Sequence, residues 1–177
     1  QQAVSVSVAI KLITPSIWDA KPPKQDPVLV GRSARIIFHH TAGREPTATV
    51  DGAKAYARTI QAMHMANGWN DSGHNFLVCR NGSILVGRWF TVTAIQHKLM
   101  VRSAHCPGQN DQIGIEHEHA GTEPMTTDQR EASAELIAWI SERYGLTDTG
   151  MSVARHAATM QPFTPPAGMP VQPSVET

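Results

Sequence analysis

The sequence predicts an α/β domain in which helices flank a mixed central β-sheet, and three observations support this. The run from Ile36 to Phe38 has the β-branched and aromatic character of a buried strand. Between Val50 and Ala66, apolar residues recur at spacings of three and four, which is the period of an amphipathic helix. Asn81-Gly82 separates two apolar runs and is a strong hairpin signal, because both residues tolerate positive φ. We therefore expect a helix packed on a sheet that contains at least one antiparallel pair.

The N-terminal half of the domain is predicted as a proline-rich lead, a strand and a helix. The lead covers residues 1–30, and its prolines cannot continue a helix, so we expect it to wrap the domain surface. The first core strand should run from Arg35 to His40. In the following helix, from about Val50, the buried face is expected to carry Ala53, Ala57, Ile60 and His64, with Asn67-Gly68 as the C-terminal stop.

Two hairpin strands and a third strand are expected next. The hairpin strands should run from His74 to Cys79 and from Ser83 to Val86. The segment from Ile113 to His119 alternates, so one face carries isoleucines and histidines while Gly114, Glu116 and Glu118 lie on the other. That strand can present Glu116 away from the isoleucines.

The C-terminal part is predicted as a helix, a short strand and an extended tail. Thr126-x-x-Gln129 fits a capping box before a helix from about Asp128 to Tyr144, which Gly145 ends. A strand from Met151 to Ala154 would then lead into His156. Residues 161–177 form a proline-rich tail.

Length, charge and hydropathy limit the classes of protein. The 177 residues fit one domain, and we expect a single domain over 1–177. Lys+Arg and Asp+Glu both number 15, so the basic surface typical of nucleic-acid binders is not expected. No stretch reaches the roughly 18 to 20 apolar residues that span a bilayer. The chain starts at Gln1, which suggests removal of an initiating segment and a secreted protein.

Cys79 and Cys106 permit at most one disulfide. Cys79 ends a predicted strand and Cys106 lies in a predicted loop. Two free thiols are at least as plausible as a bridge, so the redox compartment stays open.

The most informative stretch is His39-His40-Thr41, which follows the first predicted strand directly. Neutral imidazole is a common zinc ligand, and a buried strand that ends in histidine can deliver one to a pocket. Two adjacent histidines are a weak pattern, and they point to opposite faces of a strand. On this pattern alone, a strand followed by a polar loop is equally plausible.

Further segments follow in a fixed order and carry a family resemblance. They are Ile13 to Pro23 with Trp18-Asp19-Ala20-Lys21-Pro22-Pro23, Arg35 to Gly43, Gly68 to Val78 with Gly-Trp-Asn-Asp-Ser-Gly-His-Asn-Phe, Ser103-Ala104-His105 with Asn110, and Ile113-Gly114-Ile115-Glu116. Together they resemble the peptidoglycan recognition protein and type 2 amidase superfamily. The resemblance implies the peptidoglycan recognition protein-like amidase fold and hydrolysis of the amide between N-acetylmuramic acid and L-alanine.

The resemblance also implies a Zn2+ ion held by His39 and His156. Zinc polarises a carbonyl and lowers the pKa of bound water toward about 7. The family's third ligand is a Cys eight residues after the second His in one branch, or an Asp ten residues after it in another. Thr164 and Pro166 stand at these positions here, and neither is a normal zinc ligand. Candidates for a substitute are water or His105, Cys106, His117 and His119.

For the general base, the resemblance offers two residues. His74 stands where one branch has a catalytic Tyr, and Glu116 is the Glu of Ile-Gly-Ile-Glu that another branch uses. A carboxylate near zinc can accept a proton from water and pass it to the leaving amine. An ordinary solvent-facing strand Glu is the structural alternative.

Substrate contacts carried over from the family would line a groove for a muramyl peptide. They are Trp69, Asp71, Arg88, His105 and Asn110. Their structural alternatives are core packing for Trp69, a loop cap for Asp71, a surface charge for Arg88 and a turn for Asn110. His64 is interpreted as a partly buried helical residue outside the site.

The sequence therefore predicts a zinc-dependent N-acetylmuramoyl-L-alanine amidase whose partners are peptidoglycan or muropeptides. The alternative is a binding module of the same fold that recognises muramyl peptides without cleaving them, because its zinc site is incomplete. An unrelated, metal-free α/β domain with structural histidines is a third hypothesis.

Overall fold

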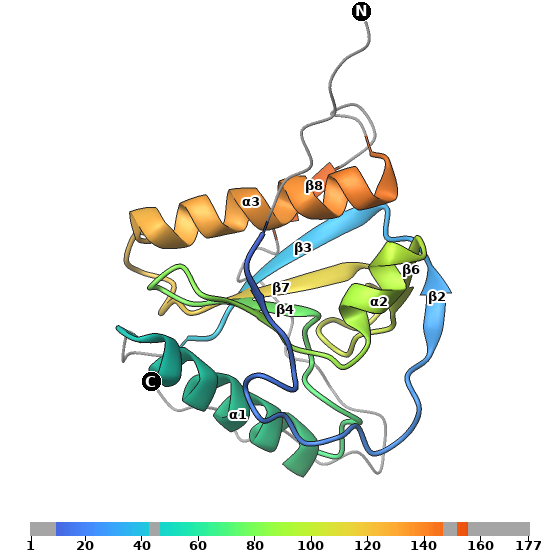
Figure 1. Cartoon of the computed structure of the whole chain (residues 1–177), viewed down its shortest axis with the longest axis horizontal. Helices are drawn as coiled ribbons and strands as arrows, with labels where there is room; N and C mark the ends of the chain where they lie inside the picture. Colours follow the sequence, from blue (N-terminus) through green and yellow to red (C-terminus); the bar gives the residue numbers. More distant parts are fainter. Residues whose placement is uncertain (1–9, 43–46, 147–151, 156–177) are drawn as a thin grey trace, which may run out of the picture.

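A six-stranded mixed sheet forms the centre of the computed structural model, which describes residues 10–42, 47–146 and, as backbone alone, 152–155. Figure 1 shows the sheet between its two longer helices. The strand order is β1-β5-β4-β7-β3-β8. In chain order these strands are β1 (Leu12–Ile13), β3 (Arg35–His40), β4 (Phe76–Val78), β5 (Ile84–Val86), β7 (Ile113–His117) and β8 (Ser152–Arg155). Among them, β4 and β5 are antiparallel and every other neighbouring pair is parallel. The predicted α/β class with a mixed sheet is confirmed.

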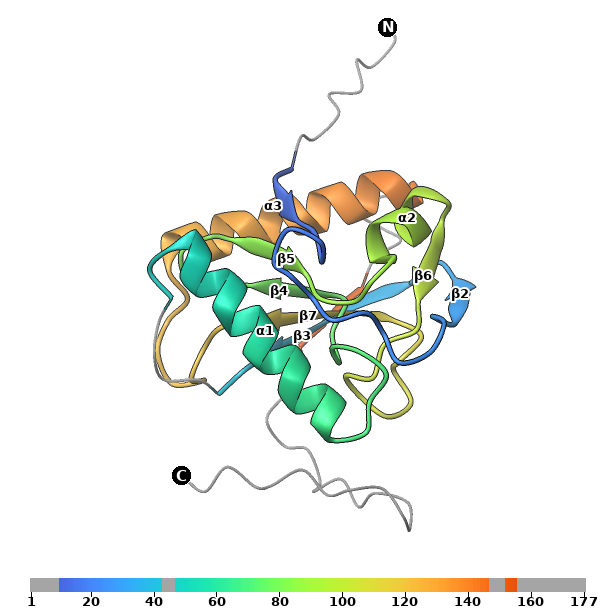
Figure 2. The ribbon, with the colours of Figure 1, turned by 60° about the horizontal axis from the view of Figure 1, so that its bottom comes forward.

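Helices α1 (Val50–Ala66) and α3 (Thr127–Tyr144) cover opposite faces of this sheet, as Figures 1 and 2 show. Under α1, Ala57 and Ile60 pack with Leu77 and Leu85 of the hairpin strands. The α3 side buries a larger apolar cluster, made by Ile36, Phe76, Val78, Ile84, Val86, Ile113, Ile115, Leu136, Trp139 and Ile140 among others. The sheet therefore packs against each helix through a layer of buried apolar side chains.

Local sequence signals set both ends of α1. The Thr49 side chain accepts a hydrogen bond from Gly52 N, and this N-cap satisfies a backbone donor that the first turn would otherwise leave unpaired. Asn67 is the C-cap, and Gly68 follows with φ 89°. Ala53, Ala57, Ile60 and His64 are buried, so the predicted helix and its inner face are confirmed.

Helix α3 begins and ends as predicted, but its capping box is incomplete. The Thr126 side chain accepts from Gln129 N, and Gly145 adopts the left-handed conformation with φ 63°. Gln129 does not return a hydrogen bond to Thr126. Its side-chain amide is fully buried and donates to Val78 O and Glu118 O, both at 3.0 Å, because these carbonyls lie where the neighbouring strands end.

The N-terminal lead belongs to the fold more fully than the sequence suggested. Trp18 is fully buried, and its indole nitrogen donates to Val86 O at 2.9 Å. The lead also supplies β1 and β2 (Leu29–Gly31), which pairs antiparallel with β6 (Leu99–Val101). Helix α2 (Thr91–Gln96) precedes β6. These elements have two to six residues each, too few for a periodic signal.

Within the described part of the chain, Cys79 and Cys106 are both buried free thiols, so the question left open by the sequence is answered against a bridge. In the same residues, none of the helices is long and apolar enough to cross a bilayer.

Candidate functional site

The candidate site lies where the parallel strands β3 and β7 end. Their register places His39 opposite Glu116, one residue before each strand ends. Figure 1 shows the two strands side by side. His39 and His40 point to opposite faces, since the His39 ring contacts His74 and His105 while the His40 ring lies 6.4 Å from that of His119. Of the pair, His39 enters this site and His40 lies on the other face of the strand.

Three imidazoles, His39, His74 and His105, form what we call the histidine cluster. Ring centroids lie 5.0 Å apart for His39 and His74, 4.8 Å for His39 and His105, and 6.0 Å for His74 and His105. His39 Nε2 is 2.8 Å from His105 Nδ1, a hydrogen-bond distance. Burial lowers the pKa of His105 to about 4 and that of His74 to about 3, so both rings are neutral near pH 7.

Glu116 lies against this cluster. Its Oε2 is 2.5 Å from His74 Nε2, and 8% of its side chain is exposed. Burial raises the pKa of Glu116, because a charged carboxylate loses hydration there. The carboxyl group borders a small cavity that His74 and Ser72 also line. A carboxyl group with a raised pKa beside neutral imidazoles can accept and return a proton.

His64 belongs to this neighbourhood, contrary to the sequence interpretation. Its Nδ1 accepts from Gly73 N at 2.8 Å, and its ring lies 5.9 Å from His74 and 4.5 Å from Trp69. Tyr56, two turns earlier on α1, hydrogen-bonds to the Thr41 side chain. The spacing of four through Ile60 put all three positions on one face, and this signal could have indicated that α1 contributes polar side chains to the site.

Two glycines make room for the rings. A Cβ on Gly114 would lie 2.4 Å from His105 Cδ2, and one on Gly73 would lie 2.5 Å from Trp69 Cζ3. Both distances are shorter than a van der Waals contact, so a side chain at either position would displace the ring. Glycine at position 114, in Ile-Gly-Ile-Glu, therefore allows the His105 ring to pack directly against the strand.

Three of the residues predicted to contact substrate form internal hydrogen bonds that hold loops in place. Asp71 is 2% exposed, and its carboxyl group accepts from Gln61 Nε2, Ser72 N and Trp89 N. Arg88 is 5% exposed and donates to Ser72 O at 2.5 Å. Asn110 Oδ1 accepts from Cys106 N at 2.9 Å.

The other two predicted contacts lie in the site itself. Trp69 packs against His64, and His105 reaches His39. These two side chains therefore contact histidines of the candidate site directly.

The described residues account for only part of the predicted metal centre. Among them, no three His, Cys, Asp or Glu side chains form a group that could hold a metal ion. His156, Thr164 and Pro166 lie outside the described residues. The register of β3 and β8 pairs Phe38 with Arg155, the residues immediately before His39 and His156.

Of the four substitute ligands considered from the sequence, His105 contacts the His39 ring, whereas His117 Nδ1 lies 3.2 Å from the His39 backbone oxygen. His117 lies on the α3 face, where its Nε2 is 2.9 Å from Ser133 Oγ and its ring contacts Phe38. His119 Nδ1 accepts from Gly121 N. Cys106 sits in the loop after His105, and burial raises the pKa of its thiol, which disfavours the thiolate that binds metal.

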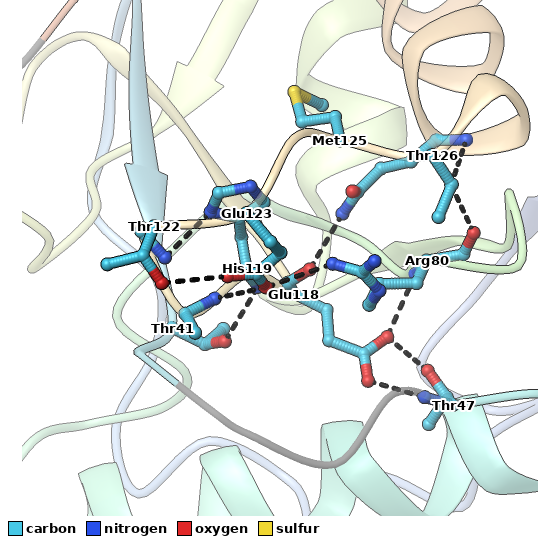
Figure 3. Close-up of polar contacts among 12 residues, drawn as sticks. Thr41, Thr47, Arg80, Glu118, His119, Thr122, Glu123, Met125 and Thr126 are labelled. Atoms are coloured by element: carbon cyan, nitrogen blue, oxygen red, sulfur yellow. Dashed lines mark hydrogen bonds and ion pairs between the residues drawn. The ribbon is translucent and has the colours of Figure 1, made fainter.

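Glu118, two residues beyond Glu116 on the same face, ties three segments together beside the site (Figure 3). Glu118 is 1% exposed, and its carboxyl group accepts from Thr47 N at 2.6 Å, from the Thr47 hydroxyl and from Arg80 N at 2.9 Å. It thereby joins the end of β7 to the start of α1 and to the hairpin turn. Arg80 also forms an ion pair with Glu123 at 3.0 Å.

Replacing Glu118 with Ala is expected to lower the free energy of unfolding by about 3 kcal/mol, because two part-buried backbone N–H groups and the Thr47 hydroxyl lose their acceptor. Glu123→Ala removes a more exposed ion pair with the same Arg80 and one hydrogen bond from Ala120 N, and should lower it by only about 1 kcal/mol. Urea unfolding followed by circular dichroism measures both values. Equal effects would show that the Glu118 contacts contribute no more than a surface ion pair.

Acid should destabilise the metal-free protein through the buried imidazoles. Burial lowers the pKa of His64 to about 4 and that of His74 to about 3, below the ordinary 6.5. The unfolded chain therefore binds more protons, so stability is full above pH 6.5 and falls as the pH drops toward 4. We expect the urea midpoint to decrease between pH 7 and pH 5, and to decrease less in His64→Gln. An identical decrease in both proteins would contradict a contribution from His64.

A family model places the chain among known proteins. The model described as Amidase_2, N-acetylmuramoyl-L-alanine amidase, matches residues 30–166. This range holds every described strand of the six-stranded sheet except β1, and it contains His39, His74 and Glu116.

Individual relatives agree with this match. Peptidoglycan-recognition protein LB of Drosophila melanogaster is 30% identical over 107 residues, which is 59% of this chain and 42% of that protein, so the chain spans less than half of its length. The structure of bumblebee peptidoglycan recognition protein SA superposes on this one with a TM-score of 0.73 at 23% identity. The superposition covers 93% of this chain and 92% of that one, and it shows that the two chains share a fold.

A third comparison concerns a protein with a ligand. A variant of Drosophila peptidoglycan recognition protein LB in complex with tracheal cytotoxin superposes with a TM-score of 0.69 at 26% identity, covering 82% of each chain. The family model, the relatives and the fold agree: the chain belongs to the superfamily of type 2 N-acetylmuramoyl-L-alanine amidases and peptidoglycan recognition proteins.

Proposed function

We propose that this protein is a zinc-dependent N-acetylmuramoyl-L-alanine amidase that acts on peptidoglycan or muropeptides. The observation that carries the proposal is the position of Glu116. Its carboxyl group is hydrogen-bonded to neutral His74 and paired across two parallel strands with His39, in a chain of the amidase family. A buried acid at that place has a direct use in amide hydrolysis and little use in packing.

In this proposal His39 and His156 hold the metal. The β3–β8 register supports the pair, because Phe38 and Arg155 are partners and each precedes one of the two histidines. These two residues would supply neutral imidazoles, which are common zinc ligands. When bound, zinc supplies a Lewis acid that polarises the scissile carbonyl.

Glu116 is the proposed general base. It accepts a proton from the attacking water and then passes it to the leaving amine of L-alanine. His74 holds the carboxyl group through the 2.5 Å contact and keeps its orientation toward the site. The burial that raises the pKa of Glu116 also makes it a better proton acceptor.

The proposed substrate is a muramyl peptide. A variant of a related protein forms a complex with tracheal cytotoxin, a monomeric diaminopimelic acid-type peptidoglycan, which supports a muropeptide as the ligand class. Trp69, His64 and His105 are the described side chains that we propose to contact it. Since cell-wall peptidoglycan lies outside the cell membrane, the proposal includes a secreted protein of one domain.

A second candidate function is recognition of muropeptides without cleavage. The observation that favours it is the replacement of the family's third zinc ligand by Thr164 or Pro166. Such a module would bind substrate through the same groove and leave the amide intact.

One experiment separates the two functions. A purified muropeptide is incubated with the protein and zinc, and the products are identified by mass spectrometry while binding is measured by calorimetry. Release of a peptide with a free L-alanine amino terminus supports the amidase. Saturable binding with an intact amide supports the binding module, and the absence of both rejects this ligand class.

A further inference from the structure

The hydrogen bonds of His105 determine which of its nitrogens carries the proton. Its Nε2 lies 3.1 Å from the backbone oxygen of Gln112. A carbonyl oxygen only accepts hydrogen bonds, so Nε2 must carry the hydrogen. A neutral imidazole has one N–H, and the other nitrogen, Nδ1, therefore carries a lone pair.

That lone pair faces His39. His105 Nδ1 is 2.8 Å from His39 Nε2, and two ring nitrogens at this distance share one hydrogen. Because Nδ1 of His105 is the acceptor, Nε2 of His39 must be the donor. The lone pair of the His39 ring is then on Nδ1.

Gln112, whose backbone oxygen accepts from His105, is itself hydrogen-bonded to the beginning of β3. The Gln112 side-chain oxygen accepts from Ala34 N at 3.1 Å and from Arg35 N at 2.9 Å, where β3 begins. The carbonyl that orients His105 is thus attached to the same strand that carries His39.

The His105 ring itself has little freedom. It is 9% exposed, and it lies over Gly114 so closely that a Cβ there would be 2.4 Å from its Cδ2. Packing and the Gln112 carbonyl together fix both its position and its tautomer.

We propose that His105 is a positioning residue that fixes the tautomer of His39, with the proton on Nε2, so that Nδ1 is the atom presented to the metal. The metal part rests on the proposed function, whereas the tautomer does not. A ligating histidine usually donates its second ring N–H to an acceptor that orients it. The structure assigns this acceptor to another imidazole instead of a carboxylate or a backbone carbonyl.

This assignment also removes His105 from the substitutes for the missing third zinc ligand. Its only ring lone pair is directed at His39 Nε2, and the 2.8 Å separation is a hydrogen bond between the two nitrogens. His105 acts on the metal through His39 and does not coordinate it.

The tautomer can be measured without metal or substrate. In the metal-free protein labelled with 15N-histidine, long-range 1H–15N correlation spectra at pH 7 distinguish a protonated ring nitrogen from one with a lone pair. We expect His39 and His105 both to carry the hydrogen on Nε2. In His105→Phe, which keeps a ring over Gly114 but has no acceptor, His39 should lose this preference. A His39 hydrogen on Nδ1 in the wild type would overturn the proposal.

A second variant perturbs the same contact while keeping the imidazole. Gly114→Ala should push the His105 ring away from His39 and produce the same loss of tautomer preference. An unchanged His39 spectrum in both Gly114→Ala and His105→Phe, with both proteins folded by circular dichroism, would overturn the role of His105.

Zinc affinity, measured by competition with a chromophoric chelator, tests the consequence for the metal. His105→Phe should weaken binding by about 10- to 100-fold, as loss of an orienting partner does. His105→Asn, whose amide oxygen can accept from His39, should restore part of it, and His97→Phe at an exposed position should change nothing. Unchanged affinity in His105→Phe, or loss of one nitrogen ligand by X-ray absorption, would overturn the positioning role. If the wild type bound no zinc, the metal role and the proposed function would fail together, and the spectra would still decide the tautomer.

Discussion

Replacing Glu116 with Gln is expected to lower kcat for muropeptide cleavage by about 10² to 10⁴-fold, the usual contribution of general acid–base catalysis. The amide of Gln keeps the volume of the side chain but cannot accept a proton. Because Glu116 is buried against His74, the change also replaces a charge-assisted contact with a neutral one. Rates of L-alanine peptide release at saturating muropeptide measure the effect.

Two comparisons make this result specific. Glu135→Gln, at an exposed position on α3 across the sheet, should keep wild-type kcat. In the wild type, kcat should fall as the pH drops through the raised pKa of Glu116, since only the carboxylate accepts a proton. Wild-type kcat in Glu116→Gln would reject Glu116 as the base.

His39→Ala is expected to abolish both zinc binding and turnover. The proposed donor set contains only two imidazoles, so removal of one leaves a single protein ligand, which is insufficient to hold zinc. Zinc content after dialysis, measured by atomic emission, and peptide release would be recorded on the same sample.

His40→Ala is the matched control, because His40 is the next residue on the same strand and points to the opposite face toward His119. It should retain zinc and turnover. Equal loss in both variants would mean that the strand end as a whole is disturbed, and would contradict a ligand role specific to His39.

The parts of the fold that could be predicted have strong local signals. Helix α1 has the period, the Thr49 cap and Gly68, and the hairpin has Asn81-Gly82. The alternation in β7 also gave the correct facing of Glu116, because one face carries isoleucines that must be buried. Each of these signals lies within a few residues of the structure that it specifies.

The parts that could not be predicted depend on contacts between distant segments. Gln129 fits a capping box in the sequence, but its side chain instead satisfies two carbonyls at strand ends that come together only in the folded sheet. Asp71 was expected to contact substrate, and its three internal hydrogen-bond donors come from α1, from its own loop and from the segment after β5. Residue type alone could not distinguish a side chain with internal hydrogen bonds from one that binds substrate.

The site was predicted only in part, because some of its contacts also join segments that are distant in the sequence. The family resemblance implied that His39, Glu116, His74 and His105 belong to one site, and the alternation of Ile113 to His119 indicated which way Glu116 faces. His64 was missed, because a buried helical histidine has the same sequence signature whether it packs or faces a site. The contacts of His64 with Gly73 N and His74 form only when the loop after α1 has folded, so the sequence of the helix alone does not reveal them.

The central claim is that His39 and His156 hold one zinc ion beside Glu116. A crystal of the zinc-loaded protein, with anomalous differences collected on either side of the zinc absorption edge, tests it most directly. The account predicts a single strong zinc peak within about 2.1 Å of a nitrogen of each histidine, with the Glu116 carboxyl group in the surrounding shell. A zinc-loaded crystal with no peak at His39, or with His156 remote from it, would contradict the account.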